Sequence, residues 1–501
     1  MKNRHTLMVN SIILFALASI SSFALLTAEQ KPNVIMILTD DQGWGDLSLN
    51  GNKNLSTPNI DSLAHQGAMF DRFYVCPVCS PTRAEVLTGR YHQRSGVYST
   101  SAGGERLNIK EKTLADAFLA AGYKTAAYGK WHNGMQGPYH PNARGFEEFY
   151  GFCSGHWGNY FSPMLEHNGK IVTGEGFLVD DLTNKAMTFM EENREKPFFV
   201  YLPYNTPHSP MQVPDLYWKK FKNHPLPQRS QKRENLDHTR AALAMCENID
   251  WNVGRLLNKI DQLELKENTL VIYFSDNGPN GHRWIGDMKG KKGNTDEAGV
   301  RTPMLMRWPA GIRAGTQVTP ICSAVDLVPT LMDICGLKTP GPLPLDGFNL
   351  LPLLKGKPNA QEGRIIVNAW NKNRSARNQR FRMTRPGKLY DMIKDPGQTI
   401  DVKSKHPEVA ATMKFAMNEV YKDLVLLNKD TDKRPFYITY PKSQITQIPA
   451  RDGSSKGNIK RSNRHPNSSY YTNWIHVDDA ITWEAQSAWA GDYRAEIYYS
   501  C

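Results

Sequence analysis

Between residues 31 and 360, short apolar runs alternate with longer amphipathic stretches. The clearest apolar runs are residues 33–38, 198–202, 270–274 and 304–308. Runs of this length without polar alternation are typical of strands in a parallel sheet that helices cover on both faces. Helical periodicity predicts helices over residues 113–121, 182–192 and 236–263. We therefore expect an α/β domain over residues 31–360, with a mostly parallel central sheet flanked by helices.

The pattern changes after residue 360. Residues 361–430 contain the run Leu389-Tyr390-Asp391, then the turn-forming run Asp395-Pro396-Gly397, and then an amphipathic stretch over 407–424. Turn residues between a short strand-like run and a helical pattern predict a small C-terminal α+β subdomain.

The composition changes again at residue 431, where aromatic residues, Ser, Thr and Asn become frequent. Alternating stretches at 481–484 and 493–498 predict β-strands. So few strands are marginally stable alone. Residues 431–501 are therefore a β-rich appended segment that either packs on the larger domain or begins a longer β-sandwich. Its aromatic residues suit either a core or stacking on sugar rings; they include Tyr470, Tyr471, Trp474 and Trp483.

The first 28 residues have the pattern of a secretory signal peptide. Lys2 and Arg4 precede an apolar stretch over residues 7–26, and small residues follow at possible cleavage sites. No later run approaches the roughly 20 apolar residues of a membrane-spanning helix. We expect an exported protein, periplasmic or secreted, without stable membrane insertion.

The net charge of +12 suits a polyanionic partner. No nucleic-acid-binding motif is present, and an exported protein rarely meets nucleic acid. A sulfated polysaccharide is an equally suitable polyanion, and we expect no nucleic-acid partner. The seven cysteines are irregularly spaced and do not indicate a disulfide framework.

Two of the predicted strands end in oxygen-bearing side chains. Asp40 and Asp41 follow the first strand, and Asp276 and Asn277 follow the strand over 270–274. The carboxyl ends of parallel strands meet at the edge where α/β proteins place their sites. Carboxylate and amide oxygens in such a group suit calcium or magnesium rather than zinc.

Cys79 begins the run Cys79-Ser80-Pro81-Thr82-Arg83, which continues as a helical pattern to Gly89. Pro81 suits the first turn of a helix, so position 79 should lie just before a helix N-terminus. Backbone N–H groups and the helix dipole favour an anion there, and Arg83 is close enough in sequence to add a cation.

Three further segments place cations and imidazoles after predicted strands. Gly129-Lys130-Trp131-His132 follows a strand-like stretch over 123–128, and His208 lies shortly after the strand over 198–202. Lys292 lies in a lysine-rich loop before Glu297, although Lys289 and Lys291 are close alternatives. Histidine can exchange protons near neutral pH, and lysine can neutralise an anionic oxygen.

The Cys79 run, together with Thr88-Gly89-Arg90, resembles the signature of the type I, formylglycine-dependent sulfatases, which are arylsulfatase-like enzymes of the alkaline phosphatase superfamily. The other segments described above resemble the family's motifs and occur in the same order. The resemblance implies the alkaline-phosphatase-like sulfatase fold and a sulfuric ester hydrolase. It also implies that a maturation enzyme oxidises Cys79 to formylglycine (3-oxoalanine), whose hydrated form attacks the sulfur of a sulfate ester.

The same resemblance assigns the remaining roles. It implies a calcium ion bound by Asp40, Asp41, Asp276, Asn277 and an oxygen of the modified Cys79. Arg83 would help to activate the nucleophile, and Lys130 and Lys292 would contact the sulfate. His208 would protonate the leaving alcohol or bind the bridging oxygen, and His132 would accept a proton when the aldehyde re-forms.

Substrate contacts outside these motifs are less specific. His156 and Trp157 lie in a loop-like stretch where they suit either sugar binding or ordinary packing. The export signal, the positive charge and the aromatic segment favour a sulfated polysaccharide or oligosaccharide as the substrate. Two alternatives remain: a phosphate or phosphonate monoester hydrolase of the same superfamily, and a non-catalytic protein that binds sulfated glycans. A two-zinc phosphatase would need extra histidine ligands, and His282 is the nearest candidate.

Overall fold

A ten-stranded sheet forms the centre of the protein. The computed structural model describes residues 31–230, 232–357, 363–423, 431–440, 445–463, 467 and 469–499. The predicted signal peptide lies outside them. The strands, in spatial order, are β12 (Thr316–Val318), β2 (Ala68–Phe70), β11 (Met304–Arg307), β9 (Thr269–Ser275), β1 (Asn33–Thr39), β8 (Phe198–Pro203), β4 (Lys124–Lys130), β5 (Glu148–Phe152), β6 (Met164–His167) and β7 (Lys170–Thr173).

The middle of this sheet is parallel. Strands β9, β1, β8, β4 and β5 all run in one direction, and Val34 of β1 lies opposite Phe199 of β8 and Leu270 of β9. Antiparallel neighbours flank this block, with β11 on one side and β6 and β7 on the other. All four apolar runs of the sequence form strands, and the predicted fold class is confirmed.

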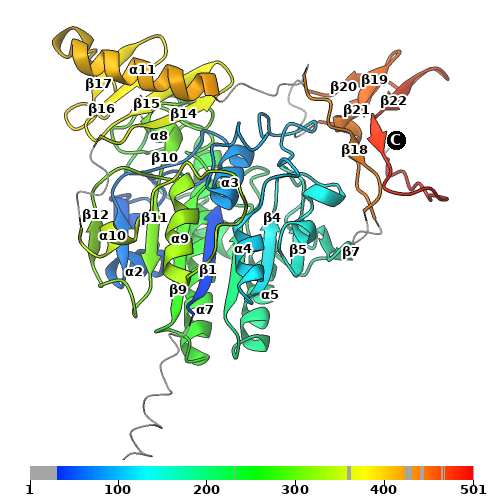
Figure 1. The fold of residues 1–501 in the computed structure, drawn as a ribbon, viewed down its shortest axis with the longest axis horizontal. Coiled ribbons are helices and arrows are strands. Elements are labelled where there is room, and N and C mark those ends of the chain that lie inside the picture. Colours follow the sequence, from blue (N-terminus) through cyan, green and yellow to red (C-terminus); the bar gives the residue numbers. More distant parts are fainter. Residues whose placement is uncertain are drawn as a thin grey trace, which may run out of the picture.

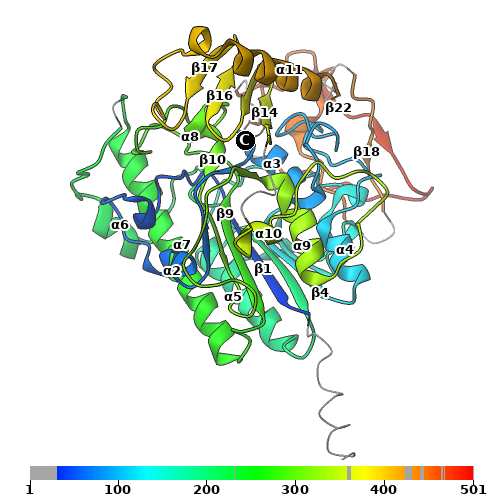
Figure 2. The same ribbon diagram turned by 60° about the vertical axis from the view of Figure 1, so that its left-hand side comes forward.

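Helices cover both faces of the sheet (Figure 2). Alternate residues of β1 belong to different cores: Val34, Met36 and Leu38 face one side, and Ile35 and Ile37 the other. The first face packs against α3 (Cys79–Thr88), α4 (Leu114–Ala120), α9 (Leu327–Cys335) and α10 (Leu351–Leu354). The second packs against α2 (Pro58–His65), α5 (Leu178–Glu192) and α7 (Leu236–Gln262), and α6 (Asp215–Phe221) packs on α7.

Helix positions agree closely with the predictions. A capping box at Thr113 and Asp116 begins α4 where expected, whereas α5 begins earlier, at Leu178. Short 3-10 turns occur at η1 (Ser48–Asn50), η2 (Gly137–Tyr139), η3 (Pro141–Ala143), η4 (Ala324–Asp326), η6 (Lys403–Lys405) and η7 (Ala450–Asp452). Within the described residues, no helix combines the length and the apolar character needed to cross a lipid bilayer.

A second, antiparallel sheet lies beyond the carboxyl ends of the parallel strands (Figure 1). Its strands are β14 (Ile366–Trp370), β15 (Asn373–Arg377), β16 (Phe381–Thr384) and β17 (Lys388–Asp391), and α11 (Pro407–Asp423) packs on it. The buried carboxylate of Glu297, at the start of α8 (Glu297–Val300), joins it to the larger domain. Glu297 accepts hydrogen bonds from Arg382 at 2.9 Å and from the Tyr74 hydroxyl at 2.8 Å. A small sheet of β10 (Arg301–Thr302), β3 (Phe73–Tyr74) and β13 (Cys322–Ser323) lies beside this contact.

The last segment contains only short strand pairs. They are β18 (Phe436–Tyr437) with β23 (Ala485–Gln486), β19 (Ser454–Lys456) with β22 (Ala480–Thr482), and β20 (Lys460–Arg461) with β21 (Tyr471–Thr472). The prediction of a strand over 493–498 is wrong. Those residues pair with no described strand and bury no face, since Ile497 is 82% exposed. Tyr470 and Trp474 are also exposed, so they are not core residues.

This segment packs on the larger domain, as one of the two possibilities left open by the sequence has it. Arg106 donates hydrogen bonds to the carbonyl oxygens of Arg434 and Pro435 at 2.9 and 2.8 Å. The Arg106 guanidinium also lies 4.6 Å from the centre of the Phe436 ring. In return, Arg434 donates to the Arg106 carbonyl at 2.7 Å. The small antiparallel sheet and this segment therefore both lie at the same end of the central sheet, where α3 begins (Figure 1).

Candidate active site

Four oxygen-bearing side chains meet where β1 and β9 end. The two strands pair in parallel with Thr39 opposite Ser275, so the residues that follow them emerge side by side. Asn277 donates a hydrogen bond to Asp41 Oδ1 at 2.8 Å, and the Asp41 N–H donates to Asp276 Oδ1 at 3.2 Å. Asp40 completes the group, and all four residues are buried. The structure thus brings together four of the five predicted metal ligands; the fifth is the modified Cys79.

The electrostatics of this group fit a divalent cation. Within the described part of the chain, Asp40 Oδ1, Asp41 Oδ2 and Asn277 Oδ1 are buried without a hydrogen-bond partner. Burial, followed by repulsion from Asp40, raises the pKa of Asp276 to about 7. Unpaired buried oxygens and crowded carboxylates both destabilise a protein unless a positive charge compensates them. An all-oxygen donor set of this kind suits a hard cation.

Two lysines already face the carboxylates. Lys130, at the end of β4, lies 2.5 Å from Asp40 Oδ2, and Lys292 lies 2.6 Å from Asp41 Oδ1. Lys289 instead lies 3.7 Å from Asp296, with a side chain that is 43% exposed. The geometry therefore selects Lys292, rather than Lys289, as the lysine that reaches the site. Burial lowers the pKa of Lys292, but Asp41 more than offsets this effect, so the pKa is raised and the ammonium stays charged.

The sequence predicts that Cys79 lies just before a helix. In the structure, Cys79 is instead the first residue of α3. Val78 is the N-cap and provides no side-chain cap. The Cys79 thiol is buried and lies within 4.8 Å of carboxylate oxygens of Asp40 and Asp276. Burial raises the pKa of this thiol, and Lys130 and Lys292 offset the effect only in part. An unmodified Cys79 would therefore be a protonated thiol and a weak nucleophile.

Arg83 is fully buried on the inner face of α3. It donates hydrogen bonds to Asp276 Oδ2 at 2.8 Å and to the Lys130 carbonyl at 2.6 Å. Thr82, one residue earlier, donates from its hydroxyl to the Asp276 carbonyl at 2.6 Å. Arg83 therefore fixes Asp276 and the end of β4 relative to α3; its guanidinium is occupied by these partners.

The two predicted catalytic histidines are both held by backbone carbonyls. His132 Nε2 lies 2.8 Å from the Thr100 carbonyl, which can only accept a hydrogen bond, so Nε2 carries the proton. His132 Nδ1 is buried and has no partner among the described residues. His208 Nδ1 lies 2.6 Å from the Ser209 carbonyl, and its Nε2 lies 3.8 Å from Asp41 Oδ2. Each imidazole therefore has one nitrogen fixed by the backbone and the other free of a backbone partner.

His156 and Trp157 lie at the edge of this group. The His156 ring contacts the His208 ring edge-on, with 5.7 Å between centroids, and Trp157 stacks on Phe152 at 5.0 Å. Both line a cavity of about 330 Å³, which also includes Arg451 and Tyr470 from the appended segment. Arg451 is absent from the sequence prediction because no local motif marks it. Only the folded chain brings it beside residues about 300 positions earlier.

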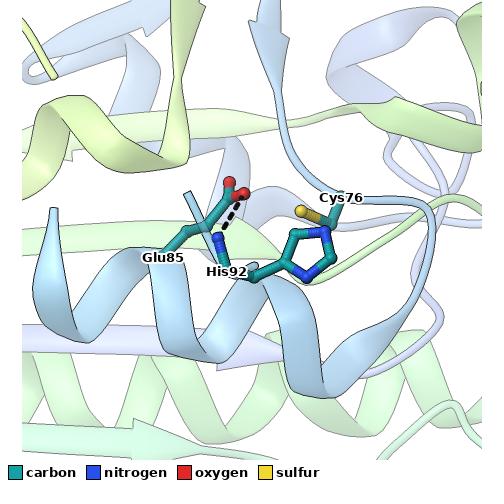
Figure 3. A group of neighbouring side chains, drawn as sticks. All are labelled: Cys76, Glu85 and His92. Atoms are coloured by element: carbon teal, nitrogen blue, oxygen red, sulfur yellow. Dashed lines mark hydrogen bonds between the residues drawn. The ribbon is translucent and has the colours of Figure 1, made fainter. Parts of the chain in front are cut away.

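A second buried group lies behind α3 and has a different character (Figure 3). Cys76, Glu85 and His92 place their ligand atoms within 4.8 Å of one another. However, His92 Nδ1 faces the Val97 carbonyl at 2.7 Å and Nε2 faces that of Ala369 at 3.2 Å. Because both ring nitrogens have backbone partners, the group braces the catalytic helix rather than offering an open metal site.

A two-zinc site of the phosphatase type needs several histidine ligands. Among the described residues, the groups that include Asp40 contain one histidine, His208. His282 belongs to no such group and is only half-buried. This arrangement disfavours the two-zinc alternative.

The family follows from sequence comparison. The Sulfatase family profile matches residues 32–337, which include all the site residues predicted from the sequence. The chain belongs to the sulfatase family. A second profile, that of the N-sulphoglucosamine sulphohydrolase C-terminal region, matches residues 291–423. The predicted family and its sulfuric ester hydrolase class are thereby confirmed.

Individual relatives of this sulfatase agree. N-acetylgalactosamine-6-sulfatase of Mus musculus is 33% identical over 379 residues, which are 68% of this chain and 69% of the relative. N-acetylgalactosamine-6-O-sulfatase of Bacteroides thetaiotaomicron is 28% identical, and the matched region covers 78% of this chain and 93% of the relative. The crystal structure of Ps i-CgsB superposes with a TM-score of 0.72 at 30% identity, over 79% of this chain and 94% of that one.

Glu85 provides a test of the brace behind α3. Burial raises its pKa to about 8. Between the unfolded value near 4.5 and pH 8, the carboxyl is protonated when folded and ionised when unfolded, so raising the pH favours unfolding. We expect the stability of the wild type relative to Glu85→Gln to fall by about 1.4 kcal/mol per pH unit over this window. Urea denaturation at several pH values measures the difference.

Glu297→Gln is the matched control, since Glu297 is equally buried. Burial raises the pKa of Glu297, but Arg382, Arg377 and Arg301 outweigh it and lower the pKa to about 2. The stability difference between this variant and the wild type should therefore stay constant between pH 5 and 8. A constant difference for Glu85→Gln as well would contradict the raised pKa of Glu85.

Proposed function

We propose that this sulfatase removes sulfate from a sulfated polysaccharide or oligosaccharide, using formylglycine derived from Cys79 and a bound calcium ion. The observation that carries the proposal is the convergence of Cys79, four oxygen donors, the buried Lys130 and the half-buried Lys292 at one end of the sheet. A charged pocket of this kind suits the three terminal oxygens of a sulfate ester.

The substrate class is supported by the named relatives and by charge. The mouse and Bacteroides relatives are N-acetylgalactosamine-6-sulfatases, and Ps i-CgsB has been crystallised with k-i-k-neocarrahexaose. Each of these names refers to a sugar, and the first two refer to a sulfatase that acts at its 6-position. The net charge of +12 favours a polyanionic substrate over a neutral one.

Asp40, Asp41, Asp276 and Asn277 would hold the calcium ion, which draws charge from the sulfate oxygens when it is bound. The donor chemistry supports calcium or magnesium over zinc, because every donor is an oxygen. Formylglycine supplies, in its hydrated form, a hydroxyl nucleophile that a thiol cannot replace. Arg83 orients Asp276 through two N–H groups at 3.1 and 2.8 Å and favours its ionised form.

Lys130 and Lys292 would bind the sulfate oxygens. Each lysine now faces one carboxylate, on opposite sides of the site. Once the carboxylates bind a cation, both ammonium groups are available to the anionic substrate. Charges held in place before the reaction cost little reorganisation as negative charge moves in the transition state.

The histidines would move protons at defined atoms. His132 Nδ1 is the acceptor, because the Thr100 carbonyl fixes the proton on Nε2. Burial, followed by the charge of Lys130, lowers the pKa of His132 and keeps the ring neutral, as a proton acceptor requires. His208 Nδ1 faces the Ser209 carbonyl and carries a proton, so Nε2, which faces Asp41, would donate to the departing alcohol or to its bridging oxygen from the doubly protonated ring.

Three further elements of the proposal concern maturation, location and domains. A formylglycine-generating enzyme must act on Cys79 before the sulfatase is active.

The signal peptide proposed for residues 1–28 would direct the protein out of the cytoplasm, so we propose a periplasmic or secreted enzyme. We also propose domain boundaries at residues 31–360, 361–430 and 431–501.

The Cys79 assignment predicts a loss of activity. Cys79→Ala should release no sulfate from 4-nitrophenyl sulfate above background, because the nucleophile is absent, while its far-UV circular dichroism stays that of the wild type. Cys322→Ala, another buried free cysteine, should stay active. Mass analysis of the wild-type peptide that contains position 79 should show formylglycine. Hydrolysis of 4-nitrophenyl phosphate in preference to the sulfate would support the phosphatase alternative instead.

The lysine assignment predicts a contrast within one loop. Lys292→Ala should lower kcat about 10²- to 10³-fold, the usual cost of losing one stabilising donor. Lys289→Ala should change kcat by less than about twofold, because Lys289 faces Asp296 at 3.7 Å, away from the site. Steady-state kinetics on 4-nitrophenyl sulfate measure both. Equal losses in the two variants would be incompatible with the selection of Lys292.

Removal of the metal tests the calcium proposal. Prolonged dialysis against EDTA should abolish sulfate release and lower Tm, because ligand binding stabilises the folded state. Ca²⁺ should restore both properties more completely than Zn²⁺. Elemental analysis of the untreated protein should find about one calcium per chain. Full activity in protein shown to be metal-free would exclude a catalytic cation.

A further inference from the structure

A cavity of about 330 Å³ opens beside the active site, between a loop of the larger domain and the appended C-terminal segment. The loop contributes His156 and Trp157, and the segment contributes Arg451 and Tyr470. Its volume is at the lower end of the range of small-molecule binding sites. It has one wall from each part of the chain, so neither part forms it alone.

The segment that forms one wall is anchored on both sides of Arg451. Gln136 donates a hydrogen bond to the Gln447 carbonyl at 3.0 Å, and the Ala102 N–H donates to Asp452 Oδ1 at 3.1 Å. Gly137 packs so closely on Tyr440 that a Cβ there would lie 2.2 Å from the tyrosine Cβ. Arg451 is therefore presented by a fixed backbone.

Arg451 supplies the positive charge of the cavity. Its Nη2 donates to Ser154 Oγ at 2.5 Å, which points the guanidinium at the loop that contains His156. Its Nε is buried and has no hydrogen-bond partner in the described chain. Asp452 Oδ1 lies 3.8 Å from this Nε and already accepts a hydrogen bond from the Ala102 N–H. The Arg451 side chain lines the cavity and is 19% exposed, and a guanidinium is suited to binding a carboxylate or sulfate.

The aromatic groups of the cavity suit a sugar ring. Trp157 is half-buried and one of its faces is covered by Phe152. Tyr470 is 67% exposed, which is unusual for a residue that lines a concave site. Aromatic faces of this kind can pack on the apolar face of a sugar while polar groups bind its substituents.

The cavity adjoins the residues that act on sulfate. His156 contacts His208, and His208 Nε2 lies 3.8 Å from Asp41 Oδ2. The partner of Arg451, Ser154, precedes Gly155, which packs against His132 so closely that a Cβ would lie 1.9 Å from its Nε2. A group in the cavity is thus separated from the candidate catalytic cluster by two imidazole rings.

We propose that the appended segment completes a binding subsite for an anionic sugar residue next to the one that carries the reacting sulfate. Arg451 binds the carboxylate or second sulfate of that residue, and Trp157 and Tyr470 pack on its ring. The inference rests on the proposed glycan substrate and extends it, because it requires a charged neighbouring sugar. It also gives residues 431–499 a function in substrate selection.

The test compares oligosaccharide and aryl substrates. The variants are Arg451→Ala, Arg451→Lys and the control Arg494→Ala, which removes the same charge from an exposed site of the same segment. Sulfate release is measured on 4-nitrophenyl sulfate, a chondroitin 6-sulfate tetrasaccharide and an ι-carrageenan tetrasaccharide, in which the neighbouring sugar carries a carboxylate or a second sulfate, respectively. Binding of the two tetrasaccharides is measured separately in the Cys79→Ala background.

For Arg451→Ala, the ratio of kcat/KM on a tetrasaccharide to that on 4-nitrophenyl sulfate should fall about 10- to 100-fold, as expected for a lost charge-assisted hydrogen bond. Kd should rise by the same factor. Arg451→Lys should lose less, and the control should match the wild type. A loss confined to the chondroitin substrate identifies a carboxylate, and a loss confined to carrageenan identifies a second sulfate.

Unchanged ratios and Kd values in Arg451→Ala, with a wild type that desulfates a tetrasaccharide, would overturn the subsite while leaving the proposed function intact. A wild type that hydrolyses 4-nitrophenyl sulfate but neither binds nor desulfates either tetrasaccharide would contradict the glycan substrate itself, and the subsite with it.

Discussion

Negative charge concentrated at the ends of two adjacent strands determines much of this structure. Asp40, Asp41 and Asp276 are all fully buried; Arg83 lies 2.8 Å from Asp276 and 3.7 Å from Asp40, and the Asp41 N–H donates to Asp276. Buried carboxylates repel one another and lose their hydration, so each needs a compensating partner. Lys130, Lys292 and Arg83 provide three cations, and the unpaired oxygens that remain match a divalent cation.

The need to neutralise the buried carboxylates also fixes the positions of the elements that carry these cations. Arg83 joins α3 to Asp276 and to the end of β4, so the helix that presents Cys79 cannot move independently of the carboxylates. Behind α3, the Cys76, Glu85 and His92 group holds the helix from its other side. Cys79, the proposed nucleophile, is therefore held between a charged network and a buried, neutral one.

The peripheral parts of the chain add to this centre without changing it. Glu297 joins the small antiparallel sheet to the larger domain through Arg382 and Tyr74. The appended segment is joined through Arg106 and Arg434 and places Arg451 beside the active site. Both attachments lie beyond the carboxyl ends of the parallel strands, where substrate specificity can vary without disturbing the core.

The amino-acid sequence by itself determined the central sheet, because strands buried on both faces leave continuous apolar runs that need no distant information. It also indicated the ligands at Asp40 and Asp276, since residues that follow adjacent parallel strands must meet. Tertiary structure alone decided between Lys292 and Lys289, directed Arg83 to Asp276, and left residues 493–498 without a strand partner. It alone placed Arg451 beside His156. These outcomes depend on contacts between side chains, and between strands, that are tens to hundreds of residues apart in the sequence. The local pattern of polar and apolar residues does not indicate such contacts.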